Sequence, residues 1–296
     1  NFYKNMQRIV FYILYPILWF ISILPFRLLY ILSDIIYVFI YYIVGYRKKT
    51  VKENLQIAFP QFTEKERLAI EKQSYKHLVD MFLEMIKTIS ISEKEINKRF
   101  VFKNLDVYLD LEKKGKSIAL MCSHYASYEW IISLNGKISF KGYAIYKRIA
   151  NEYFDTLVKD IRAKFKAYLI TTKETKKTIE ENSSKGILGV YGFASDQTPR
   201  RNHTMYWYRF FNRETPIHTG AETLAKQYNM NMIYLKVTKV GRGYYEAYFE
   251  VLTEDVNSIP DYQISELFIR KTEEQIKENP GYYLWTHKRW KHKKNE

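Results

Sequence analysis

The first 46 residues carry long apolar runs, whereas the rest of the chain alternates shorter apolar and polar stretches. Ile9 to Phe26 contain no charged side chain, and Leu28 to Tyr46 contain only Asp34. Each run approaches the roughly 20 apolar residues that span a bilayer. Both are apolar on every helix face and rich in aromatic residues, which is typical of membrane helices rather than of buried core helices. We therefore expect residues 1–46 to form an N-terminal membrane anchor.

Basic side chains flank the anchor, and positive flanks are typical of the cytoplasmic side of a membrane. These residues are Lys4, Arg8, Arg47, Lys48 and Lys49. Pro25 and Arg27 interrupt the apolar region, so one span followed by an interfacial helix and a returning hairpin both remain open. Either arrangement places residues 47–296 against the cytoplasmic leaflet, whose anionic lipids attract a chain with a formal net charge of +15.

Beyond the anchor, apolar runs of strand length alternate with amphipathic stretches of helical period. A long helix is predicted from Thr63 to Ile89, opened by a capping box between Thr63 and Glu66. Predicted strands are 117–123, 143–147, 167–170, 187–193, 232–238 and 244–252. Predicted helices are 127–134, 152–165, 173–182, 217–228 and 263–277. This alternation predicts an α/β fold with a mostly parallel central sheet flanked by helices, formed by residues 47–296 as one domain.

An ionisable pair stands at the end of the first long apolar strand. His124 follows that strand directly, and Glu129 comes five residues later. Ligands of open α/β sheets bind beyond the carboxyl ends of the strands. On one regular helix the two side chains would lie about 140° apart, so they meet only if His124 is in a loop. A carboxylate on one imidazole nitrogen makes the other a general base for a hydroxyl. A purely structural histidine–carboxylate pair is the alternative.

The chain has a single cysteine, Cys122, which excludes an intramolecular disulfide and favours a reducing compartment. Cys122 continues the apolar strand, so we do not expect it to be a nucleophile. No group of cysteines and histidines has the spacing of a zinc site, and we expect no metal.

The segment HYASYE, His124 to Glu129, resembles the His-x4-Asp/Glu motif of the glycerolipid acyltransferase superfamily. Further segments resemble one branch of it, the late acyltransferases of lipid A biosynthesis, and they occur in that family's order. They are YRKKTVKENLQIAFPQF, IYKRIANEYFDTLVKDIRAKF, YGFASDQTP, RFFNRETPIHTGAETLA and PGYYLWTHKRWK. The chain departs from the family pattern at Lys147, which stands where an arginine is usual with Arg148 next to it, and at Asn212 in place of a glycine.

The resemblance implies an enzyme that moves a fatty acyl chain from an acyl-carrier-protein thioester, or from acyl-CoA, to a lipid hydroxyl without a cofactor. The expected acceptor is a lipid A precursor, and the expected location is the cytoplasmic face of the cell inner membrane. His124 removes the hydroxyl proton and Glu129 holds the imidazole. Arg162 is expected at the oxyanion or a phosphate, and the other candidate substrate-binding residues are Lys147, Arg148, Asp196, Gln197, Arg200 and Arg201.

Several alternatives stay open at this point. Arg162 can be a solvated helix residue, and Asp196 can cap a turn. The acceptor can be a lysophospholipid, a glycolipid or an acylated amino acid. A non-catalytic basic membrane scaffold would explain the charge and the anchor, but not a histidine–glutamate pair at a strand end. The basic segment WTHKRWKHKK also suits nucleic acid, but the anchor argues against a nucleic-acid partner.

Overall fold

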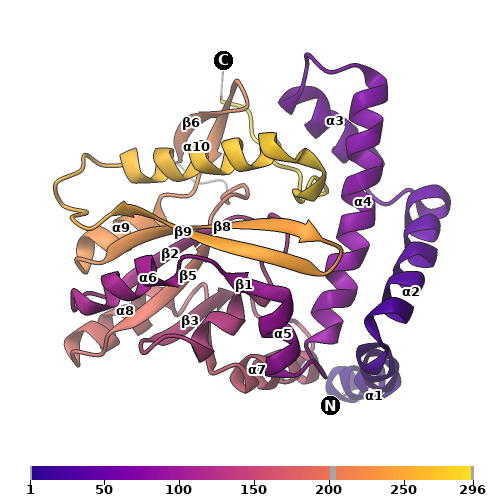
Figure 1. The fold of residues 1–296 in the computed structure, drawn as a ribbon, viewed down its shortest axis with the longest axis horizontal. Coiled ribbons are helices and arrows are strands. Elements are labelled where there is room, and N and C mark those ends of the chain that lie inside the picture. The colour runs from indigo at the N-terminus through magenta and orange to yellow at the C-terminus, as the bar shows by residue number, and fades with distance from the viewer. Residues whose placement is uncertain (1, 201–204, 295–296) are drawn as a thin grey trace.

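The computed structural model of the protein describes residues 2–200 and 205–294. It confirms the α/β fold, with a central sheet covered by helices and a helical N-terminal segment packed at one side (Figure 1). The sheet contains seven strands in the order β1-β9-β8-β2-β5-β3-β4. Only β8 and β9 are antiparallel; the other neighbouring pairs in this sheet are parallel.

Six of the seven strands match predicted apolar runs, because parallel strands covered on both faces are apolar throughout. The short edge strand β1 was not predicted. The bounds of the strands are β1 (Phe100–Phe102), β2 (Ile118–Cys122), β3 (Lys141–Tyr146), β4 (Ala167–Thr171), β5 (Gly189–Ala194), β8 (Asn231–Gly241) and β9 (Tyr244–Thr253). All five residues of β2 are buried. This strand therefore lies in the core of the sheet, and the residues that follow it emerge at the carboxyl edge.

Helices cover both faces of the sheet. On one side, α10 (Gln263–Glu278) packs against β8 and β9, and on the other lies α6 (Leu105–Lys113) (Figure 1). Successive side chains of β8 and β9 point to opposite faces of the sheet. Lys236 of β8 forms an ion pair with Glu278 of α10 on one face. Phe249 of β9, opposite Leu235, contacts Tyr108 of α6 on the other face. The remaining helices are α5 (Glu93–Arg99), α7 (Glu152–Lys164), α8 (Thr175–Ser184) and α9 (Gly220–Gln227).

Two N-terminal helices form the predicted anchor segment. They are α1 (Phe2–Ile23) and α2 (Phe26–Val38), and α2 continues as a π-helical segment, η1 (Phe39–Val44). Lys4–Ile23 and Phe26–Val44 are each long and apolar enough to cross a membrane. In the most apolar 18-residue stretch of each segment, 11% and 22% of the residues are buried, so most of their side chains are not covered by the rest of the protein.

The long helix α4 (Glu64–Lys87) joins this N-terminal segment to the sheet, and α3 (Lys48–Ala58) precedes it. The predicted capping box at its start is present, with Thr63 and Glu66 exchanging hydrogen bonds. At its other end, the Lys87 ammonium donates to the carbonyl oxygens of Ser22 and Leu24, at 2.6 and 2.7 Å. A cation thus satisfies carbonyl groups at the C-terminal end of α1.

Some predicted elements differ from the structure. The helix expected over 127–134 is a 3-10 helix, η2 (Trp130–Gly136), because residues 124–129 form an irregular loop. The helix expected from Ile217 starts at Gly220, since Ile217 ends β7 (Arg213–Ile217), which forms an unpredicted hairpin with β6 (Tyr206–Phe210). A short 3-10 helix, η3 (Pro280–Tyr282), follows α10.

Candidate active site

Two neighbouring parallel strands bring His124 and Asp196 together at the carboxyl edge of the sheet. In the register of β2 and β5, Cys122 lies opposite Ala194. His124 and Asp196 each lie two residues beyond that pair, in the loops that leave the strands. The sheet itself therefore sets the separation of these two side chains, although they are 72 residues apart in the chain.

One oxygen of Asp196 accepts two hydrogen bonds from His124, one from the imidazole and one from the backbone. The Nδ1–H group of His124 donates to Oδ1 at 2.7 Å, and the His124 backbone N–H donates to the same atom at 3.1 Å. Asp196 is completely buried, whereas 19% of the His124 side chain is exposed. With Nδ1 protonated toward the carboxylate, Nε2 is the basic nitrogen of the neutral ring.

The electrostatics of this pair favour the charged forms. Burial opposes an imidazolium, but the charge and hydrogen bond of Asp196 outweigh it, with a further contribution from Glu129, and raise the pKa of His124. Burial likewise opposes the Asp196 carboxylate, yet the charge and hydrogen bonds of His124 lower its pKa. The site is thus preorganised for a positively charged histidine next to a permanent carboxylate.

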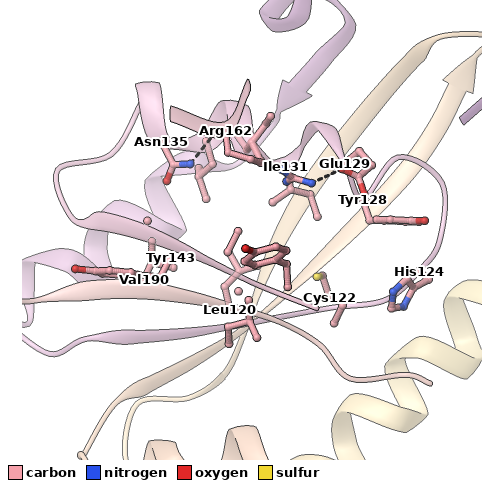
Figure 2. A pocket seen from close by; sticks show the side chains of 18 residues that line it. Leu120, Cys122, His124, Tyr128, Glu129, Ile131, Asn135, Tyr143, Arg162 and Val190 are labelled. Atoms are coloured by element: carbon pink, nitrogen blue, oxygen red, sulfur yellow. Dashed lines mark hydrogen bonds and ion pairs between the residues drawn. The ribbon is translucent and has the colours of Figure 1, made fainter. Parts of the chain in front are cut away.

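The expected hydrogen bond between His124 and Glu129 is absent. Glu129 instead forms an ion pair with Arg162 of α7, and both side chains are about four-fifths buried (Figure 2). The sequence prediction assigned the imidazole to the wrong carboxylate, because Asp196 reaches it directly across the sheet. Glu129 still contributes its negative charge near the ring, since it helps to raise the pKa of His124.

The segment after α10 holds the loop that contains His124. Leu284 donates its backbone N–H to the His124 carbonyl at 3.2 Å, and Ala126 donates to the Tyr282 carbonyl at 3.0 Å. Ala126 has a positive φ of 51°, which is unfavourable for an alanine. Its carbonyl also accepts a hydrogen bond from the His77 ring at 3.3 Å. These bonds fix a backbone conformation that an isolated loop would not keep.

A pocket of about 220 Å³ opens beside His124 and runs along the sheet beneath η2 (Figure 2). Apolar side chains from three strands and η2 line most of it, namely Leu120, Ile131, Ile132, Leu134, Ile145 and Val190. His124, Glu129 and Arg162 also line the pocket. The pocket therefore combines charged or ionisable groups with a mostly apolar lining, the arrangement expected for a ligand with a polar reacting end and an apolar tail.

Cys122 also lines this pocket, but its chemistry does not suit a nucleophile. Burial and the charge of Asp196 raise the pKa of the thiol to about 12. The reactive form of a cysteine is the thiolate, which is negligible at neutral pH for such a group. The structure thus agrees with the prediction that Cys122 is a packing residue.

The other predicted binding residues lie outside the pocket. Lys147 is exposed, and Arg148 contacts the carboxylates of Glu152 and Asp155 at 4.0 and 3.9 Å. Gln197 is partly exposed next to Asp196, and Arg200 is exposed at the end of the same loop. Arg201 lies outside the described residues. Within the described part of the chain, no group of three or more acidic, histidine or cysteine side chains could hold a metal ion.

The sequence reasoning missed two features of the site. It placed Asp196 near the cleft without recognising it as the partner of His124, because that contact follows from the pairing of β2 with β5. It did not select Tyr128, whose ring packs edge-on against the imidazole with 4.9 Å between ring centres. Spacing alone gave no signal for Tyr128.

The site thus combines a histidine held by a buried carboxylate with an adjacent, mostly apolar pocket. Residues 3–292 match the model of the bacterial lipid A biosynthesis acyltransferase family, and the chain belongs to this family. It is 22% identical over 256 residues to the lipid A biosynthesis palmitoleoyltransferase of Escherichia coli (strain K12). It is equally similar to the lipid A biosynthesis acyltransferase of Shigella flexneri, and each match covers 83% of this chain and 79% of the relative.

Proposed function

We propose that this protein transfers a fatty acyl chain from an acyl-carrier-protein or CoA thioester to a hydroxyl group of a lipid A precursor. One observation carries the proposal: the His124 imidazole is fixed through Nδ1 by buried Asp196 at an apolar pocket. The family membership supports an acyl donor and a lipid acceptor. The names of the relatives support lipid A as the product class.

In the proposed reaction, Nε2 of His124 removes the proton of the acceptor hydroxyl while its oxygen attacks the thioester carbonyl carbon. A carbon–oxygen bond forms, the carbon–sulfur bond breaks, and the imidazolium returns the proton to the leaving thiolate. Asp196 and Glu129 stabilise the imidazolium through their negative charges. Arg162 holds Glu129 in the pocket and is our candidate for the oxyanion contact. The transfer needs no covalent enzyme intermediate.

The donor chain occupies the apolar pocket in this proposal. Leu120 and Val190 line the pocket from neighbouring strands, and Ile131 and Leu134 line it from η2. Burying an acyl chain there stabilises the complex by about 0.8 kcal/mol for each methylene group. The thioester end then lies where the pocket meets His124 and Glu129.

We further propose that residues 1–46 anchor residues 47–296 at the cytoplasmic face of the inner membrane. The exposed side chains of α1, α2 and η1 are mainly large and apolar, with Ile13, Phe20, Ile35 and Ile43 each at least 60% exposed. Water-exposed apolar surface of this extent favours transfer to lipid. The basic flanks, the free thiol and a soluble acyl donor support the cytoplasmic side.

The test is lipid mass spectrometry of cells that lack the endogenous enzyme and express the wild type, His124→Ala or Cys122→Ala. We expect the wild type and Cys122→Ala to add one acyl chain to the lipid A fraction. His124→Ala should lower turnover roughly 100- to 10,000-fold at an unchanged melting temperature, the usual contribution of a positioned base.

Two results would contradict the proposal. An acyl chain added to a lysophospholipid, a glycolipid or an acylated amino acid, with lipid A unchanged, would replace the acceptor. A folded His124→Ala protein with wild-type turnover would rule out the histidine as the base.

A further inference from the structure

A second pocket, of about 560 Å³, lies between α2, α4 and the turn of the β8–β9 hairpin. In Figure 1 this hairpin ends beside α4, near α2. Its lining contains three cations, Lys76, Lys239 and Arg242, and two carboxylates, Asp34 and Asp80. The pocket thus carries one surplus positive charge, while its volume falls in the range of small-molecule sites.

The carboxylates are engaged by two of the three cations. Arg242 forms ion pairs with both Asp34 and Asp80, at 2.8 and 2.7 Å. Lys239 lies 3.5 Å from Asp80 and donates to the His77 ring at 3.2 Å. Burial and the charge of Lys239 lower the pKa of His77 to about 3, so the ring adds no positive charge.

Lys76 carries the surplus charge. It forms no ion pair with a residue that the structure describes, and its ammonium lies 5.4 Å from the centre of the Tyr37 ring. It is exposed on α4 and lines the pocket. An anion entering the pocket would therefore find an available lysine beside a partly satisfied one.

Two exposed apolar side chains also line this pocket. Val38 of α2 is 50% exposed and Val240 of the hairpin is 56% exposed. Val38 belongs to the second of the two segments that can cross a membrane. An exposed lysine and exposed valines in one pocket suit an amphiphile whose anionic group contacts the lysine and whose apolar part contacts the valines.

We propose that this pocket binds the phosphate of a lipid head group, with Lys76 as its main contact and Lys239 as the second. This inference rests on the proposed membrane anchoring, because a lipid reaches the pocket only from a nearby bilayer. The phosphate belongs either to the acceptor or to a surrounding phospholipid.

The pocket is also connected to the loop after His124. Lys239 donates to Nδ1 of His77, so Nε2–H of the same ring donates to the Ala126 carbonyl. Tyr282, another lining residue, accepts the hydrogen bond from the Ala126 N–H group. Head-group binding at Lys239 would thus act through His77 on the hydrogen bond that holds Ala126, the positive-φ residue of the loop after His124.

The test is native mass spectrometry of the full-length protein in uncharged detergent, titrated with dioctanoyl phosphatidic acid or dioctanoylglycerol. The wild type should retain the phosphatidic acid more tightly. Lys76→Gln should weaken its binding about fivefold, the value of one lysine near an anionic surface, and Lys76→Arg should restore it. The matched control is Lys185→Gln, which removes an exposed lysine at the end of α8, just before β5 and so at the amino edge of the sheet.

Equal binding of the two lipids, or equal binding by Lys76→Gln and Lys185→Gln, would overturn the proposal. This measurement requires no turnover, so it fails independently of the proposed reaction. A kinetic assay in the same detergent distinguishes the two sources of phosphate. A raised KM for the acceptor in Lys76→Gln, at unchanged kcat, assigns the pocket to the acceptor. An unchanged KM, with loss of stimulation by added phosphatidylglycerol, assigns it to the surrounding lipid.

Discussion

Replacing Asp196 by asparagine tests the central geometry most directly. The change keeps the size of the side chain and an oxygen that can accept from the His124 backbone N–H group, but it removes the buried negative charge. A hydrogen bond to a charged group contributes about 1.5–3 kcal/mol. Because this bond strengthens as the imidazolium forms in the proposed reaction, its loss should lower kcat roughly 10- to 150-fold.

The pH profile gives a second and more specific readout. His124 acts as a base only in its neutral form, so kcat/KM should rise with pH through the raised pKa of His124. Asp196 outweighs burial in raising that pKa, so Asp196→Asn should move the rise to lower pH while the plateau falls. The assay is acyl transfer from a radiolabelled acyl-carrier-protein thioester, measured between pH 5 and 9. A variant with an unchanged plateau and an unchanged rise would refute the role of Asp196.

Two further predictions concern the pocket and the core. Gly192 lines the proposed acyl pocket, and a Cβ at this position would contact only the Tyr143 carbonyl oxygen, at 3.7 Å. We therefore expect Gly192→Leu to fold. Its larger side chain should shorten the pocket and shift the donor preference toward shorter acyl chains. Each excluded methylene should cost about fourfold in kcat/KM, measured with donors of graded length, and an unchanged preference would place the chain elsewhere. Burial raises the pKa of Glu84 to about 7, whereas its value in the unfolded chain is near 4.5. Between these two pH values the folded state binds a proton that the unfolded state has released. The free energy of unfolding should therefore fall by roughly 3 kcal/mol as pH rises from 4.5 to 7. Glu84→Gln should remove this loss in denaturant titrations at pH 5 and 8; the same pH dependence in both proteins would contradict the assignment.

The sequence predicted the sheet well and the site less well, for different physical reasons. Strands such as β2 are continuous apolar runs because both faces are buried, and such runs are visible in the sequence. The β6–β7 hairpin was missed because its strands mix exposed polar and buried residues without a clean alternation. The 3-10 helix η2 replaced a predicted α-helix because the preceding loop is fixed by contacts with residues 282–284.

The partner of His124 depended on strand order, which local periodicity does not contain. His124 and Glu129 are close in sequence, so a sequence motif connects them readily. The bond from His124 to Asp196 arises because β2 and β5 are neighbours with Cys122 opposite Ala194. Predicting it requires both the strand order and the register, since a shift of one residue would turn the side chains to opposite faces.

The hydrogen bonds between the His124 loop and the segment after α10 affect when the enzyme becomes active during synthesis. Leu284 and Tyr282 hold the loop, and the backbone of Trp285 accepts from Asn54 of α3. The site therefore draws on two distant parts of the chain, and residues 282–285 are synthesised long after α1 and α2. If α1 and α2 enter the bilayer as proposed, a nascent chain would do so while its active-site loop still lacks this support. The proposed anchor would then hold the protein at the membrane before His124 is held in place.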